Sequence, residues 1–198
     1  MMIKVIILFS LILFSCPIWA TFFSRMPIEK QVEEANAAGE VRLSSSRVFK
    51  NSNGMIMTEY SFDVLQSYNL FEDDIEGKVL KLTAPGGTYE GVTSMIDGAP
   101  DFQLGEHSFL LLKKLESKIY LSNFTLGKYK IQNLGGADYY VSEVFPQDPQ
   151  MGKIAKSKMI ELMKNSWKIS SSYKPESQKI GSQALKENNS QDMATISF

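Results

Sequence analysis

Cysteine and histidine are almost absent from this chain of 198 residues, with Cys16 and His107 as the single examples. If Cys16 leaves with a signal peptide, no disulfide, cysteine nucleophile or soft thiolate ligand remains. A lone histidine excludes a zinc site built on two histidines, and a Ser-His-Asp triad would have to use His107. The protein must therefore depend on a hydrophobic core, for which its length is sufficient.

The chain also has no large excess of positive or negative charge, since it contains 21 lysines and arginines and 22 aspartates and glutamates. Without a basic stripe the chain has no electrostatic footprint for nucleic acid, and we expect no nucleic-acid partner.

Phosphate-binding loops are missing as well. Pro85-Gly86-Gly87 matches neither the P-loop nor the dinucleotide pattern, and no predicted helix follows it. We interpret this stretch as a turn or bulge after a strand.

No apolar run is long enough to cross a bilayer as a helix. The longest spans residues 5–14 after Lys4, about ten residues where roughly 20 are needed. Residues 1–20 are therefore predicted to be a signal peptide cut after Ala20, which predicts an exported bacterial protein, periplasmic or extracellular. In the alternative, Leu-Phe-Ser-Cys resembles a lipobox with Cys16 as the acylated residue. The protein would then reach a membrane only through that lipid.

The remaining sequence predicts a mainly β protein with a short helix at each end. Apolar residues at helical spacing predict one helix over residues 27–36, ended by Gly39, and a second over residues 151–165. Between them, short alternating segments separated by turn residues predict five to seven strands. We expect a small OB-like or sandwich β-barrel.

We divide the chain accordingly into four parts. These are the signal peptide (1–20), a β-domain (21–150), a C-terminal helix (151–165) and a tail (166–198). The tail is rich in serine, lysine, glutamine and asparagine and has no sustained periodicity, so we interpret it as flexible.

Residues 98–106 are predicted to form two turns that frame a buried aromatic side chain. Pro100 keeps its predecessor extended, so that Phe102 and Leu104 would point into the core. Glu106 would accept backbone amides at the start of the following strand. This structural reading accounts for the stretch without any ligand.

The stretch APGG…GVTSMIDGAPDFQLGEHSFLLLKK, followed by KIYLSNFTLGKYKI, resembles a group of uncharacterised exported bacterial domains. These share a PGG turn, a G-x-P-x-F turn, a G-E pair and a leucine-rich strand, and the resemblance covers residues 27–132. In layout it is more distantly similar to the OB-type barrel of netrin-like modules, including the tissue inhibitors of metalloproteinases. The inhibitors' N-terminal cysteine is missing here, so their zinc-chelating mechanism is not implied. Neither family implies catalytic residues.

Candidate site residues are few. Tyr129, Tyr139 and Tyr140 are a candidate binding face, because aromatics line ligand surfaces on such barrels, but the preferred interpretation is core or cross-strand packing. His107 is interpreted as structural or solvent-facing. The acidic residues between 72 and 76 lack the spacing of a calcium loop and are interpreted as a solvated connection, with a calcium site as the alternative. We expect no cofactor.

The predicted function is that of an exported, non-enzymatic binding or envelope-associated module, whose partner is an envelope or exported protein. One alternative is an inhibitor or accessory partner of an exported protease. Another is a hydrolase that uses His107 with Ser108 or an acidic partner. The residue pattern identifies no ligand.

Overall fold

The computed structural model describes residues 25–70, 75, 78–115 and 118–167. The predicted signal peptide, Cys16, the acidic residues at 72–74 and 76, and the predicted tail from residue 168 lie outside the described residues. Of the helices in those described ranges, none has the length and apolar character needed to cross a membrane.

Strands predominate, with one helix before them and one after. In chain order the elements are α2 (Ile28–Glu34), β1 (Ala37–Lys50), β2 (Ile56–Tyr68), β3 (Val79–Pro85), β4 (Gly87–Tyr89), β5 (Val92–Ser94), β6 (His107–Leu115), β7 (Lys118–Leu121), the 3-10 helix η2 (Phe124–Gly127), β8 (Lys128–Leu134), β9 (Ala137–Ser142), β10 (Lys153–Ala155) and α3 (Lys156–Trp167). The predicted mainly β class, with a helix near each end of the domain, is confirmed. The strands outnumber the predicted five to seven because β4, β5 and β10 are three-residue strands, too short to leave a pattern.

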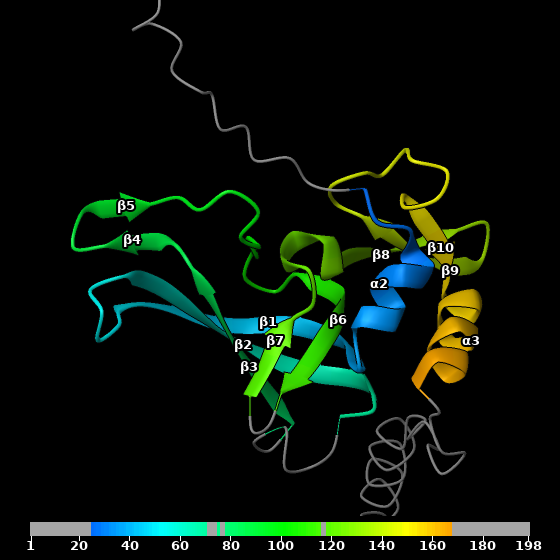
Figure 1. The fold of residues 1–198 in the computed structure, drawn as a ribbon, viewed down its shortest axis with the longest axis horizontal. Helices are drawn as coiled ribbons and strands as arrows, with labels where there is room; N and C mark the ends of the chain where they lie inside the picture. Colours follow the sequence, from blue (N-terminus) through cyan, green and yellow to red (C-terminus); the bar gives the residue numbers. More distant parts are fainter. Residues whose placement is uncertain (1–24, 71–74, 76–77, 116–117, 168–198) are drawn as a thin grey trace, which may run out of the picture.

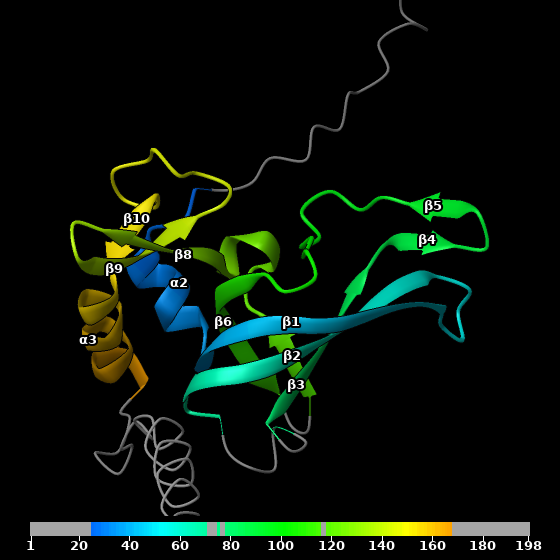
Figure 2. The same cartoon turned by 180° about the vertical axis from the view of Figure 1, so that it is seen from behind.

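Eight strands form one antiparallel sheet in the order β10-β9-β8-β6-β1-β2-β3, and β7 pairs with β6 beside β8. Strands β4 and β5 form a separate two-stranded sheet. Figure 1 shows the β1–β2 and β4–β5 hairpins reaching to one side as an arm, while α2 and α3 lie at the opposite end. Figure 2 shows the same division from behind. In the described part of the chain, the outermost strands β3 and β10 do not pair with each other, so backbone pairing does not close the sheet.

Each face of the sheet carries its own apolar core. Phe109 and Leu111 point toward α2 and α3, whereas Leu110 and Leu112 point to the other face, where Phe102 completes the packing. All of these side chains are buried. Because β6 supplies both cores, its sequence is almost continuously apolar instead of alternating.

The helix boundaries differ from those predicted. The first helix ends at Glu34, and Gly39 lies inside β1, where it pairs with both β2 and β6. The start of the predicted second helix is β10, which pairs with residues 139–141 of β9, so α3 begins only at Lys156. In both places, pairing with another strand overrides the expectation drawn from the local pattern.

Candidate functional site

The tyrosines of the candidate binding face are largely core residues. Tyr129 and Tyr140 are fully buried, while Tyr139 is half-buried. The Tyr129 hydroxyl donates to Gln31 Oε1 at 2.6 Å, and the Tyr140 hydroxyl donates to Glu40 Oε1 at 2.6 Å. Burial raises the pKa of both phenols well above its ordinary value. The rings of Tyr129 and Tyr140 belong to the core on the side of α2 and α3 and cannot meet a ligand, as the packing interpretation expects.

His107 stands at the start of β6, partly exposed, beside a buried carboxylate. Its Nε2 lies 3.9 Å from Glu40 Oε2, and Glu40 is also paired with Lys156 Nζ at 2.6 Å. Partial burial lowers the pKa of His107, although the negative charge of Glu40 opposes that shift. The next residue, Ser108, points to the opposite face, where its hydroxyl donates to Glu106 Oε1 at 2.8 Å. His107 therefore has an acidic neighbour, but Ser108 does not form a dyad with it.

The most exposed apolar side chains lie around the β5–β6 connection, residues 95–106. Among the described residues the three highest values are those of Met95 (88% exposed), Leu104 (76%) and Val92 on β5 (63%), and Ile96 beside Met95 is 47% exposed. Phe102 in the same connection is buried, so the sequence prediction is right for Phe102 and wrong for Leu104. The cause is a turn at residues 103–106, closed by a hydrogen bond from the Glu106 amide to the Gln103 carbonyl at 2.9 Å. Strand alternation stops there, and Leu104 turns outward.

Despite these exposed side chains, the backbone of the connection is held by hydrogen bonds to the rest of the fold from residue 98 to residue 106. The Tyr60 hydroxyl of β2 donates to the Pro100 carbonyl at 3.3 Å, and the Thr125 hydroxyl of η2 donates to the Gly98 carbonyl at 2.8 Å. Strand β1 makes two backbone hydrogen bonds with residues 105–106 at 2.9 and 3.0 Å. Contacts from β1, β2 and η2 thus hold the connection against the sheet.

A buried lysine provides the strongest of these attachments. Lys128 of β8 is 2% exposed, and its Nζ lies 2.8 Å from Glu106 Oε1 and 3.0 Å from Glu143 Oε2. The same ammonium donates to the Asp101 carbonyl and sits 4.3 Å from the centre of the Phe102 ring. A buried charge is stable only when it is paired and hydrogen-bonded, as this one is. Through Lys128, this network therefore attaches the connection to β8 on the buried side of the connection; we call it the clamp.

The electrostatics of Glu106 follow from that network. Burial by itself would raise the pKa of this carboxyl, but the hydrogen bonds from Lys128, the Gln103 amide and the Ser108 hydroxyl outweigh it and hold the pKa below its ordinary value. Glu106 does accept a backbone amide, as the sequence predicts, although the amide belongs to Gln103 in the preceding turn, at 2.9 Å. The ionised carboxylate is thus part of the folded loop.

The surface formed by this part of the chain carries no basic residue of its own. No lysine or arginine occurs between Lys81 and Lys113, whereas Glu90, Asp97 and Asp101 are all exposed there. Within this segment, exposed aliphatic side chains are thus combined with negative charge only. A complementary surface would be apolar and rimmed by positive charge.

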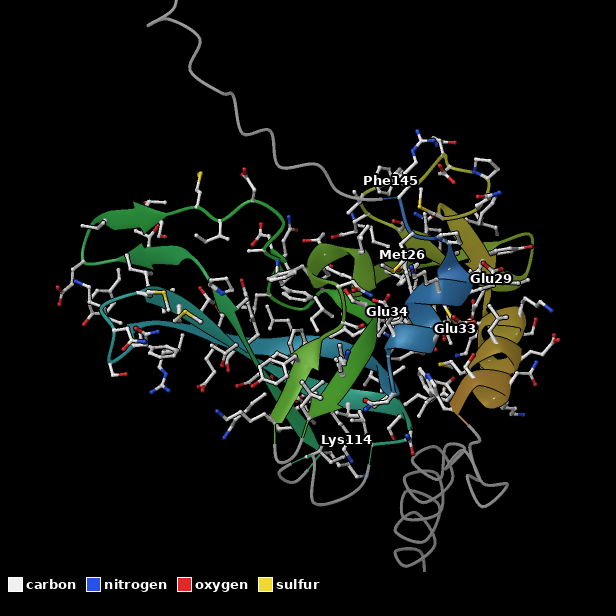
Figure 3. The ribbon with its side chains drawn as sticks, in the orientation of Figure 1. Met26, Glu29, Glu33, Glu34, Lys114 and Phe145 are labelled. Carbon is white, nitrogen blue, oxygen red and sulfur yellow. The ribbon has the colours of Figure 1, made fainter. Side chains whose placement is uncertain are left out.

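Two shallow hollows lie at the other end of the molecule. Their volumes are about 400 and 490 Å³, and they share Pro149 in the connection between β9 and β10. Glu29 of α2 lines the first and Phe145 lines the second; Figure 3 shows both residues near Met26, far from the β4–β5 arm. Neither hollow brings together a buried ionisable group and a nucleophile, so neither has the composition of an active site. We place the candidate site at the β5–β6 connection because its exposed apolar side chains lie on a backbone that is held in place.

Within the described ranges, no cluster of three or more histidine, aspartate or glutamate side chains is suited to holding a metal ion. Comparison with protein-family models, curated proteins and solved structures finds no match. The candidate site therefore rests on its geometry.

The sequence predicts turns for residues 98–106 but not that Leu104 is exposed there. The absence of lysine and arginine around these residues is the feature of the sequence that could have indicated a distinct surface.

Proposed function

We propose that this protein is an exported, non-enzymatic binding module that attaches to another exported or envelope protein through the β5–β6 connection. The proposal rests on two features that occur together at this connection, exposed apolar side chains and a backbone that is held in place. Met95 and Leu104 are 88% and 76% exposed, yet the backbone from residue 98 to residue 106, which follows Met95 and contains Leu104, is held by β1, β2, η2 and β8. A loop without a partner usually presents polar side chains and is mobile.

The physical advantage of this arrangement is a low cost of ordering on binding. Association must offset the loss of loop and side-chain freedom, and a loop held in place beforehand loses less. Methionine and leucine then supply apolar area, and methionine adapts its shape to the surface it meets. The partner we propose is a protein with an apolar depression and basic residues around it, since this surface is acidic. Nucleic acid does not fit that charge.

Export is the second part of the proposal, and it is supported by the sequence of residues 1–20 alone. A signal peptide cut after Ala20 leaves a freely diffusing protein, whereas acylation of Cys16 holds it at a membrane surface. The intact mass of the protein from its native envelope separates these outcomes. A chain starting at Thr21 without an adduct indicates the first, and a lipid adduct on Cys16 indicates the second. An uncleaved chain starting at Met1 contradicts export by this route.

The binding surface is tested by photocrosslinking in the native cell, with the reactive side chain placed at Met95. We expect a discrete protein adduct that disappears when Leu104→Asp is added, while the melting temperature of the purified protein stays unchanged. The matched control is Leu134→Asp, which alters an exposed apolar residue (41%) at the last position of β8, six residues beyond Lys128. The adduct should survive that change. An adduct that survives Leu104→Asp equally well contradicts the proposed surface.

The pinned connection also favours a second candidate, the inhibitor of an exported protease. Protease–inhibitor complexes are usually pre-organised, and their interface backbone moves little on binding. If the crosslinked partner is a protease, inhibition by the wild-type protein and its loss in Leu104→Asp would establish this function. Cleavage of the connection without inhibition would contradict it.

A further inference from the structure

The β4–β5 hairpin turns away from the main sheet at two glycines. Gly86 and Gly87 have φ angles of 107° and 122°, and a Cβ on Gly87 would lie 2.6 Å from the Thr58 hydroxyl oxygen. The hairpin then reverses through Glu90 and Gly91, both with positive φ, as expected of a two-residue type I′ turn. Figures 1 and 2 both show β5 as the outer strand, with β4 between it and the β1–β2 arm.

One residue of β5 directs its backbone groups toward the free edge. Tyr89 and Val92 flank the two-residue turn and form the hydrogen-bonded pair, so the next pair, Thr88 and Thr93, is the non-hydrogen-bonded one. Their hydroxyl oxygens lie 3.0 Å apart, consistent with the closer side chains of such a pair. The N–H and C=O of Thr93 therefore point away from β4, where no described strand meets them.

Outer strands of the described sheets differ in how they are protected. Strand β3 carries Lys81 and ends at Pro85, and β10 begins with Lys153. Lysine and proline are residues that proteins place on edges to prevent pairing with another chain. Strand β5 and its continuation to residue 96 contain neither a charge nor a proline, and Val92, Met95 and Ile96 are exposed along them. This edge lacks the usual protection.

We propose that β5 accepts an extended segment of the partner as an added strand, paired with the backbone of Thr93. This rests on the proposed function and specifies how the partner binds, namely by backbone pairing beside the apolar side chains of the β5–β6 connection. The segment alternates apolar side chains with lysine or arginine, because Glu90 and Asp97 border the edge. A second copy of this chain is disfavoured, since it would place acidic residues against acidic residues.

The test uses the purified protein and a blocked synthetic peptide of alternating lysine and valine. Amide hydrogen exchange is measured residue by residue with increasing peptide. We expect exchange of the Thr93 amide to slow at least about tenfold, as a newly formed backbone hydrogen bond requires. The same peptide with methyl groups on alternate backbone nitrogens should give no protection. Protection of α2 or β10 with none at Thr93 overturns the inference.

Substitutions at one position separate backbone pairing from side-chain binding. Thr93→Pro removes the edge N–H and is tolerated sterically on an edge strand, whereas Thr93→Val retains the N–H and serves as the control. We expect the proline variant to bind the peptide at least about tenfold more weakly, and the valine variant to bind it as the wild type does. Equal binding by both variants overturns edge pairing.

The two proposals fail in different ways. If the Met95 photocrosslink survives Thr93→Pro but is lost in Leu104→Asp, the binding surface stands and edge pairing is wrong. If no Met95 adduct forms but the peptide protects Thr93, the edge accepts a strand while the proposed site on the β5–β6 connection is wrong. A dimer that Thr93→Pro dissociates would overturn the assignment of the edge to a foreign segment.

Discussion

Replacing Lys128 with methionine should destabilise the protein far more than a similar change at the surface. Methionine retains most of the apolar stem and its packing on Phe102, so the substitution removes chiefly the charge. The Glu106 and Glu143 carboxylates, with side chains 17% and 19% exposed, would then lose a cation at 2.8 and 3.0 Å. Breaking a buried ion pair by removing one partner costs about 3 to 5 kcal/mol.

The lower end of that range applies to Lys128→Met. Glu106 keeps its bonds from Gln103 and Ser108, and Glu143 keeps Lys130 at 3.3 Å, so neither carboxylate is left without a partner. We therefore expect a loss of about 3 kcal/mol in the free energy of unfolding. Lys130→Met is the matched control, because that lysine also pairs with Glu143 but is 57% exposed. It should cost less than about 0.5 kcal/mol.

Urea unfolding at several pH values supplies the assay. The pKa of Glu106 is lowered in the folded protein, so its stabilising contribution is full above the ordinary glutamate pKa and is lost as pH falls through the lowered value. The Lys128→Met variant lacks the cation that stabilises the ionised Glu106. The difference in the free energy of unfolding between wild type and this variant should therefore become smaller below about pH 4.5. Equal stability of the Lys128→Met variant and wild type at pH 7 would refute the clamp described for the β5–β6 connection.

Three further predictions concern single residues. Gly127→Ala should cost at least about 2 kcal/mol in urea unfolding, because the new methyl group would collide with a backbone oxygen of the preceding turn; wild-type stability contradicts this. Tyr140→Phe should cost about 1 to 2 kcal/mol through its lost hydroxyl, whereas Tyr139→Phe should be nearly neutral, and equal costs would contradict the contact with Glu40. The imidazole resonances of His107 should titrate below pH 6.5, and Glu40→Gln should lower their midpoint further; an upward shift would contradict the assigned pair.

Part of the candidate site could be recognised before the structure was known. The predicted turns at residues 98–106 and the buried Phe102 are found there, and Glu106 accepts a backbone amide, although from Gln103 in the preceding turn and not from the following strand. The outward direction of Leu104 could not be predicted, because it depends on a hydrogen bond that closes the turn two residues later. Lys128 was equally hidden, since its neighbours Glu106 and Glu143 come from separate segments of the chain.

Local pattern by itself determined the class of fold, because strand alternation and helical spacing depend on residues close together in the chain. It located the β1–β2 hairpin and the central strand β6, and it excluded chemistry that needs a pair of histidines. Tertiary structure decided everything that needs distant partners: that Gly39 lies in a strand, that Tyr129 and Tyr140 pack under helices, and that β5 is an open edge. The reason is that burial and strand pairing depend on contacts between different segments of the chain. The residue pattern of one segment carries no information about which other segments will contact it.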